Sequence, residues 1–225
     1  DAARHPDAPQ IWCAMQREFN SHMDCGTWVY RPQSECYREG RTPIDNMWVF
    51  DCKVDQTSRE FLLWKARLVG RGDQMVYLRD FFQTYSGVIR LSTFRTFLSV
   101  CALYDLTLTG ADVSTAYLHA PLRNCTVWMK QPKGFDGVVV EGEPALCLLK
   151  MALYGLRQSA REWAITLAQW LEGPPQFFSR CVSDRYMFVK KEGDKVLYLL
   201  LWVDDIFIGC NDAEMRGKFM KAFSV

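Results

Sequence analysis

Two adjacent acids, Asp204 and Asp205, interrupt an otherwise apolar segment that runs from Leu200 to Ile208. Aspartate also favours ordinary turn geometry, so the pair alone fits a simple turn between two strands as well as a functional site. The segment contains no Asn or Gly, however, and both flanks are strongly apolar. Buried strands on either side would hold the carboxylates rigidly, which is what a metal site requires.

A site for two divalent metal ions needs a third acid beside Asp204 and Asp205. Asp112 follows a predicted strand over residues 106–111 and precedes a short helical turn. Carboxylate oxygens at strand ends suit Mg²⁺, for which Mn²⁺ can substitute, and Mg²⁺ also keeps water and substrate phosphates among its ligands. Two such ions about 3.5–4 Å apart would clamp an in-line displacement at phosphorus. We therefore expect Asp112, Asp204 and Asp205 to converge in space.

Two cations stand at alternate positions of a predicted strand over residues 61–69. Lys65 and Arg67 share one face, and the opposite face is apolar, with Leu62, Trp64, Ala66 and Leu68. The stretch from Lys53 to Arg95 holds eight cations against four anions, although the net charge of the chain is only +1. Dedicated nucleic-acid binders are usually more basic. An exposed basic face and an anion-binding face both fit this pattern.

The remaining pattern predicts a mixed fold without a regular βαβ rhythm. Helices are predicted over 9–23, from Ser92, from Ser159 with Glu162 completing a capping box, and after Asn211 as the N-cap of the last helix. Strands are predicted over 27–30, 47–53, 61–69, 106–111, 145–150, 186–190, 196–203 and 206–209. This order favours an α+β fold with a largely antiparallel sheet covered by helices on one face.

The composition narrows the class of protein. A chain of 225 residues with 49% hydrophobic and 24% charged residues is typical of a globular protein with one large domain or two small ones. The longest apolar run, Val196 to Val203, is too short to cross a bilayer, so no membrane partner is expected. No secretion signal opens the chain. Nine cysteines without a CxxC spacing, and only three histidines, argue against a zinc site.

Eight short motifs occur in an order and spacing that match one family. They are Trp12-x-Ala14-Met15-x-x-Glu18; Thr27-Trp28; Trp48-Val49-Phe50-x-x-Lys53-x-Asp55; Lys65-Ala66-Arg67-Leu68-Val69-x-Arg71-Gly72; Asp112-Val113-x-Thr115-Ala116-Tyr117-Leu118; Met129-x-Gln131-Pro132-x-Gly134-Phe135; Leu153-Tyr154-Gly155-Leu156-Arg157-Gln158 with Arg161 and Trp163; and Trp202-Val203-Asp204-Asp205. From about Pro9 onwards, the chain resembles the reverse transcriptase of copia-like (pseudovirus) LTR retrotransposons, as a fingers and palm fragment of a Pol polyprotein.

The resemblance implies a right-hand polymerase. An N-terminal extension and helix would occupy residues 1–27, the fingers 28–88 and 120–152, and the palm 89–119 and 153–225, truncated before the primer grip, with thumb and RNase H absent. The implied activity is that of an RNA-directed DNA polymerase, a nucleotidyltransferase. In the implied reaction, a primer 3′-OH attacks the α-phosphate of a dNTP with the help of two Mg²⁺ ions.

The resemblance also implies roles for single residues. Asp112, Asp204 and Asp205 would be the catalytic triad; Asp112 and Asp204 would bind both ions, Asp205 would be more peripheral, and the carbonyl of Val113 would complete one metal shell. The nucleotide-binding residues would be Lys65 and Arg67 at the triphosphate, Tyr117 as a steric gate against a ribose 2′-OH, and Tyr154, Gly155 and Gln158. Trp202 would lie beside the primer end. On the residues alone, Tyr117 fits a packed aromatic equally well, and Gly155 fits a simple turn.

Some positions depart from the family pattern. Trp202 stands where Tyr is customary, and Ala160 stands where Pro usually follows, although no catalytic acid is lost. The implied partners are an RNA or DNA template with its primer, dNTPs, and the remaining Pol regions, namely thumb, RNase H and integrase. The implied location is intracellular, in a cytoplasmic virus-like particle and the nucleus. Two rival functions stay open: a catalytically weak or inactive retroelement remnant that only binds nucleic acid, and a metal-dependent nuclease.

Overall fold

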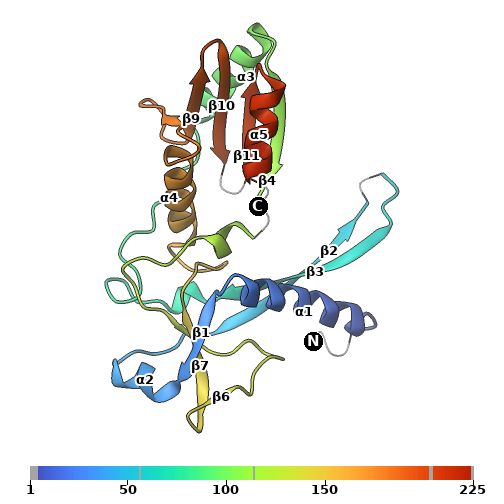
Figure 1. Ribbon diagram of the computed structural model, residues 1–225. Helices are drawn as coiled ribbons and strands as arrows, with labels where there is room; N and C mark the ends of the chain where they lie inside the picture. The colour runs from blue at the N-terminus through green and yellow to red at the C-terminus, as the bar shows by residue number, and fades with distance from the viewer. Residues whose placement is uncertain (1–4, 56, 114, 203–204, 224–225) are drawn as a thin grey trace. The chain divides into compact units, whose positions relative to one another are not determined.

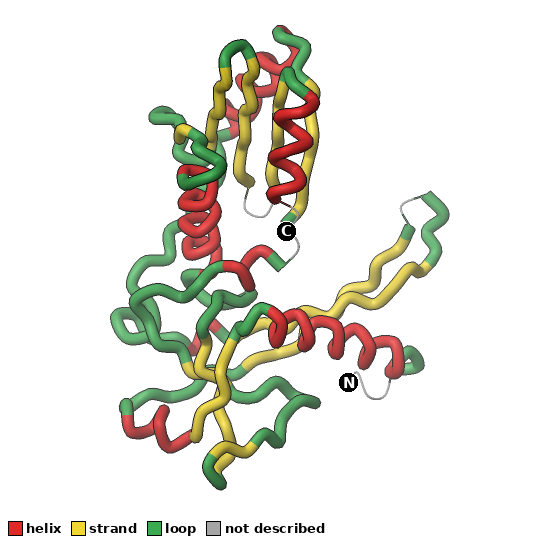
Figure 2. Tube along the Cα trace, viewed as in Figure 1, coloured by secondary structure: helices red, strands yellow, loops and turns green. Residues whose placement is uncertain are grey.

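The structure is a computed structural model that describes residues 5–55, 57–113, 115–202 and 205–223. It has a mixed α/β fold with antiparallel sheets, as predicted, which Figure 1 shows as a ribbon and Figure 2 as a tube coloured by secondary structure. The chain divides into two compact units, each made of two segments. Unit 1 is Asp1–Thr84 with Tyr117–Trp163, and unit 2 is Tyr85–Ala116 with Ala164–Val225.

Unit 1 contains two separate antiparallel sheets. Its elements are α1 (Ala8–Asp24), β1 (Trp28–Pro32), α2 (Gln33–Arg38), β2 (Asn46–Val54), β3 (Phe61–Gly70), the 3₁₀ helix η2 (Gly72–Gln74), the 3₁₀ helix η3 (Ala116–His119, which begins at the boundary), β5 (Trp128–Met129), β6 (Val139–Val140) and β7 (Glu143–Leu149). In one sheet the strand order is β1-β7-β5, with β6 also pairing with β7. The other sheet is the long hairpin of β2 and β3.

The helix α1 runs along β3 and buries an apolar stripe against it (Figure 1). A proline in the first turn suits this helix, because its fixed φ is helical and its missing N–H has no partner there. Ile11 and Met15, one helical turn apart, are buried in one cluster with Ala66 of β3. The helix predicted over 9–23 is therefore confirmed, and each end extends by one residue.

Two side chains of α1 cover the outer edge of β3. Within the described residues β3 pairs only with β2, so the backbone groups on its other edge need different partners. Arg17 donates through Nη2 to the carbonyl of Trp64 at 3.3 Å, and the Leu68 N–H donates to Oε1 of Glu18 at 3.2 Å. Side-chain hydrogen bonds from α1 therefore close an edge that would otherwise be open.

Unit 2 is built on one antiparallel sheet with the strand order β4-β11-β10-β9-β8. Its elements are α3 (Leu91–Leu103), β4 (Thr107–Asp112), α4 (Ser159–Glu172, which begins in unit 1), β8 (Ser179–Arg180), β9 (Met187–Glu192), β10 (Lys195–Trp202), β11 (Asp205–Cys210) and α5 (Ala213–Phe223). The strands predicted on either side of the adjacent acids are present and pair with each other, and β4 pairs with β11 along its whole length.

Helices pack on both faces of this sheet, so the prediction of helices on one face is wrong. Alternate residues of a strand point to opposite faces. Leu200 of β10 packs with Phe97 of α3 in one cluster. Leu197 points to the opposite face and lines a cavity together with Met215 and Phe219 of α5. The physical reason is that β10 is apolar at almost every position, so neither of its faces is suited to water.

Two predicted helix caps differ from the structure by one residue. α5 follows Asp212, whose carboxylate accepts the Met215 N–H at 2.7 Å, whereas the Asn211 side chain bonds the backbone at the start of β10. α4 begins at Ser159 itself, so Ser159 is not its N-cap, and the hydroxyl donates to a loop carbonyl instead. Among the described helices, none combines the length and the apolar character that a membrane crossing needs.

Candidate active site

The acids Asp112 and Asp205 are direct cross-strand neighbours. Asp112 is the last residue of β4 and Asp205 is the first of β11, and the register of these antiparallel strands pairs the two. Residues paired in this way have Cα atoms about 4.5–5.5 Å apart and side chains on the same face of the sheet. Both residues are exposed. The fold thus brings together two carboxylates that are distant in the sequence.

Trp202 extends this row on the other side of Asp205. As the last residue of β10 it pairs with Asp205, so the side chains of Trp202, Asp205 and Asp112 share one face at one end of the sheet. The indole is 39% exposed, which leaves it accessible to a ligand. Val113 follows Asp112 directly and is half-buried. Asp204, the third acid of the predicted triad, lies outside the described residues.

The carboxylates of Asp112 and Asp205 repel each other, and a bound cation would reduce this repulsion. Like charges placed opposite each other on adjacent strands are destabilising, by about 1 kcal/mol at 4 Å in water. Within the described residues no group of three or more His, Cys, Asp or Glu side chains is arranged to hold a metal ion, and this row supplies two carboxylates. Carboxylate oxygens are the hard donors that Mg²⁺ prefers, so the chemistry of the donors fits that ion.

A second group of predicted residues lies together in unit 1. The Arg67 guanidinium lies over the ring of Tyr154, 5.8 Å from its centroid. The Tyr154 ring meets the Tyr117 ring edge to face, with 4.6 Å between their centroids. All three side chains are half-buried. Because an aromatic face attracts a guanidinium and orients it, Tyr154 links a cation of β3 to the aromatic side chain on η3.

Hydrogen bonds fix the loop that carries Tyr154 to the end of β3 and to the start of η2. The Gly70 N–H donates to the Tyr154 carbonyl at 2.8 Å, and Arg157 donates through Nε to the Gly72 carbonyl at 2.9 Å. Gly155 has a φ of +89°, and a Cβ there would overlap the carbonyl oxygen of Gly70. Glycine is therefore required at 155 by packing, and a contact of Gly155 with a nucleotide stays a prediction.

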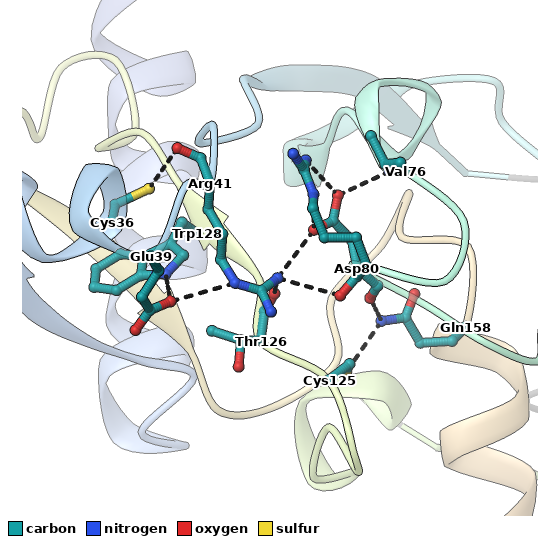
Figure 3. A network of polar contacts seen from close by, with 10 residues as sticks. Cys36, Glu39, Arg41, Val76, Asp80, Cys125, Thr126, Trp128 and Gln158 are labelled. Carbon is teal, nitrogen blue, oxygen red and sulfur yellow. Dashed lines mark hydrogen bonds and ion pairs between the residues drawn. The ribbon is translucent and has the colours of Figure 1, made fainter.

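Gln158, which was predicted at the nucleotide, belongs to a buried polar network (Figure 3). Its side chain is only 2% exposed, and Nε2 donates to the carbonyl of Asp80 at 3.4 Å and to Sγ of Cys125 at 3.5 Å. In the described structure Gln158 ties the start of α4 to the loop that follows η2. A contact of Gln158 with a nucleotide stays a prediction.

The centre of this network is the buried carboxylate of Asp80. It accepts hydrogen bonds from Arg79 at 2.8 and 2.9 Å, from Arg41 at 3.2 Å and from the Val76 N–H at 2.8 Å (Figure 3). These residues did not stand out in the sequence. One feature of the sequence could have indicated the network: Asp80 lies within the aromatic stretch from Tyr77 to Phe82, and a charge buried among apolar residues needs partners.

The chain matches one known protein family over most of its length. The sequence pattern of that family, described as Reverse transcriptase (RNA-dependent DNA polymerase), covers residues 34–224. The matched segment contains the paired acids of unit 2 and the Arg67–Tyr154–Tyr117 group of unit 1. The chain therefore belongs to the reverse transcriptase family, and the predicted resemblance is confirmed.

Its relatives are polyproteins of transposons. The chain is 32% identical over 228 residues to the retrovirus-related Pol polyprotein from transposon TNT 1-94 of Nicotiana tabacum, which covers 98% of this chain and 16% of that protein. It is 31% identical over 211 residues to the Pol polyprotein from transposon RE2 of Arabidopsis thaliana, covering 94% of this chain and 14% of that protein. The truncated transposon Ty1-A Gag-Pol polyprotein of Saccharomyces cerevisiae is 28% identical over 217 residues, covering 92% of this chain and 16% of that protein. The chain thus spans about one sixth of the length of these curated relatives.

Proposed function

We propose that this chain is the polymerase part of a retrotransposon Pol polyprotein and that it extends a primer on an RNA or DNA template. One observation carries the proposal: the register that pairs Asp112 with Asp205 at exposed strand ends. The reaction joins the 3′-oxygen of the primer to the α-phosphorus of a dNTP. The bond between the α-phosphorus and the bridging oxygen breaks, pyrophosphate leaves, and the hydroxyl proton passes to solvent.

We assign most of unit 1 to the fingers and most of unit 2 to the palm of a right-hand polymerase, with the residues 117–119 and 153–163 of unit 1 belonging to the proposed palm. The proposed fingers, residues 28–88 and 120–152, and the proposed palm, residues 89–119 and 153–225, follow the family resemblance. The support from the fold is that the paired acids stand on the sheet of unit 2, whereas the predicted triphosphate cations stand on the hairpin of unit 1.

The carboxylates of Asp112, Asp204 and Asp205, with the carbonyl of Val113, would hold the metal ions. Two Mg²⁺ ions bound there would supply Lewis acidity at the α-phosphate, favour the alkoxide form of the primer hydroxyl and neutralise the leaving pyrophosphate. The protein's own contribution is to keep the acids side by side on paired strands, in spite of their mutual repulsion.

The residues of unit 1 would bind and select the nucleotide. Lys65 and Arg67 would neutralise the triphosphate, and the Tyr154 ring would hold the Arg67 guanidinium in place. Tyr117 would exclude a ribose 2′-OH, and its edge-to-face contact with Tyr154 would fix the ring that does so. The exposed indole of Trp202, beside Asp205, would lie against the primer end.

The test is primer extension on poly(rA)/oligo(dT) with Mg²⁺ or Mn²⁺. We expect incorporation of dTTP by the wild type and its loss, by at least about a hundredfold, in Asp112→Asn and Asp204→Asn. Asp194→Asn, an exposed acid in the turn between β9 and β10, is the matched control and should leave extension unchanged. Incorporation that survives the Asp112 and Asp204 changes contradicts the proposal. Template binding without incorporation favours a remnant that only binds nucleic acid, and cleavage without dNTPs favours a nuclease.

The proposed partners are a template with its primer, dNTPs and the remaining Pol regions, because the matched relatives are Pol polyproteins several times longer than this chain. The proposed location, a virus-like particle in the cytoplasm and later the nucleus, rests on the same family membership.

A further inference from the structure

A groove between α1 and the β2–β3 hairpin of unit 1 carries a concentration of positive charge. The hairpin extends beside α1 in Figure 1, and the groove has a volume of about 250 Å³. Three cations, Arg17, Lys53 and Lys65, line it together with a single acid, Glu18. The lining thus has an excess of positive charge, and it opens to solvent along one side of the hairpin.

The acid in the groove is already engaged. Oε1 of Glu18 accepts the Leu68 N–H at 3.2 Å and lies 3.6 Å from Nε2 of His22. Among the described residues, no carboxylate lies within ion-pair distance of Lys53 or Lys65, in contrast to Lys130, which Asp45 holds at 2.7 Å. The ammonium groups of this groove are therefore available to an external anion.

The hairpin face beside the groove carries exposed apolar side chains between its cations. Phe61, Leu63 and Lys65 alternate on one face of β3, and the register places Lys53 opposite Leu63 on the same face. Phe61 is 46% exposed and Leu63 is 43% exposed. Exposed apolar residues that adjoin each other mark interaction surfaces. Cations next to exposed apolar side chains, one of them the aromatic ring of Phe61, are a chemistry that binds single-stranded nucleic acid, with phosphates on the cations and a base on the ring. The register also places one acid, Asp51, opposite Lys65 on this face.

We infer that this groove binds the phosphodiester backbone of a single-stranded nucleic acid, with Arg17 and Lys53 as phosphate contacts. The inference rests on the proposed function in that the strand would be the unpaired part of a template. It adds Arg17 and Lys53, neither of which belongs to the proposed nucleotide site. Lys65 borders both sites, so it cannot distinguish them and is left unchanged in the test.

The experiment measures fluorescence anisotropy of short 5′-fluorescein-labelled oligo(dT) and oligo(rU) over a range of salt concentrations. Lys53→Gln and Arg17→Gln should each weaken binding by about threefold to tenfold and lower the salt slope by about 0.7. Lys133→Gln, an exposed lysine of unit 1 outside the groove lining, is the control and should bind like the wild type. Arg17 also donates to the Trp64 carbonyl, so Lys53→Gln decides the result if Arg17→Gln lowers the melting temperature.

The outcomes separate this inference from the proposed function. If the wild type extends primers but Lys53→Gln binds the oligonucleotides with unchanged affinity and salt slope, the groove proposal is overturned while the polymerase proposal stands. If binding depends on Lys53 and Arg17 but no dTTP is incorporated, the groove is supported and the polymerase proposal fails. A Lys53→Gln variant that loses affinity for dTTP but not for the oligonucleotides makes the groove a nucleotide site and overturns the inference.

Discussion

Neutralising one acid of the cross-strand pair should stabilise the protein in the absence of divalent metal. Asp205 faces Asp112 across β11 and β4, and both are exposed, so each carboxylate lies in the unfavourable field of the other. Asp205→Asn keeps the size and shape of the side chain and removes that repulsion. The same change removes a proposed metal ligand, so the stability advantage of the variant should shrink when Mg²⁺ is added.

The magnitude follows from the cross-strand geometry. Opposed like charges on a solvated sheet surface cost about 0.5–1 kcal/mol, which corresponds to a rise in Tm of roughly 1–4 °C for a chain of this size. Mg²⁺ at ten times its Kd should stabilise the wild type by about 1.4 kcal/mol through mass action. Mg²⁺ should stabilise the Asp205→Asn variant by less than half of that amount, because the variant has lost a carboxylate that would bind the ion.

The assay is thermal unfolding at low ionic strength, first in EDTA and then with added Mg²⁺. Asp194→Asn is the control, because that acid is exposed on the same unit but lies in the turn between β9 and β10. An Asp205→Asn variant that is less stable than the wild type in EDTA, or that responds to Mg²⁺ as fully as the wild type, would refute the reasoning about the pair.

Four further outcomes are expected. Tyr117→Ala should raise the use of ribonucleotides at least about tenfold in primer extension, and an unchanged selectivity between dNTP and rNTP would contradict the role of Tyr117 as the gate. Tyr154→Leu should raise the KM for dNTP by about twofold to fivefold, because the aromatic contact with the Arg67 guanidinium is lost. Asp80→Ala should cost about 3–5 kcal/mol in urea unfolding, because it removes the buried carboxylate that Arg41 and Arg79 share and leaves the Val76 N–H without its acceptor; a loss below 1 kcal/mol would show that the network is not a structural centre. Burial raises the pKa of Asp184, but hydrogen bonds from the Arg90 N–H, the Thr93 hydroxyl and the Tyr186 N–H outweigh it, and the pKa lies below its ordinary value. The stability from Asp184 is therefore fully present above about pH 4, the ordinary carboxyl pKa, and is lost as the pH falls through the lower folded pKa, so the destabilisation by Asp184→Asn should shrink in acid.

The long periodic elements of this chain were readable from the sequence. The alternation around Lys65 and Arg67 predicted a strand over 61–69, and the structure has it at Phe61–Gly70. The short elements α2, β5, β6 and β8 were missed, since six residues or two cannot display a helical or strand period. The second covered face of the unit 2 sheet was missed because a wholly apolar strand gives no signal of which side is exposed.

The candidate site was readable in part. The position of Asp112 and Asp205 next to apolar strands indicated that they stand at strand ends, and the fold pairs them in register. The burial of Gln158 was not readable, because a polar residue in a familiar motif carries no information about which loop encloses it. The bridge that Tyr154 makes between Arg67 and Tyr117 depends on three segments meeting in space, which no local pattern records.

The cover that α1 places over β3 has a practical consequence for anyone who shortens this protein. The family pattern begins at residue 34, so a polypeptide trimmed to 34–224 would lack the whole of α1. The Trp64 carbonyl and the Leu68 N–H would then be left without their side-chain partners on a long, partly apolar strand. Such a strand recruits the same strand from another molecule, so the trimmed polypeptide should self-associate and precipitate. Expression boundaries for this family member should be drawn upstream of Ala8.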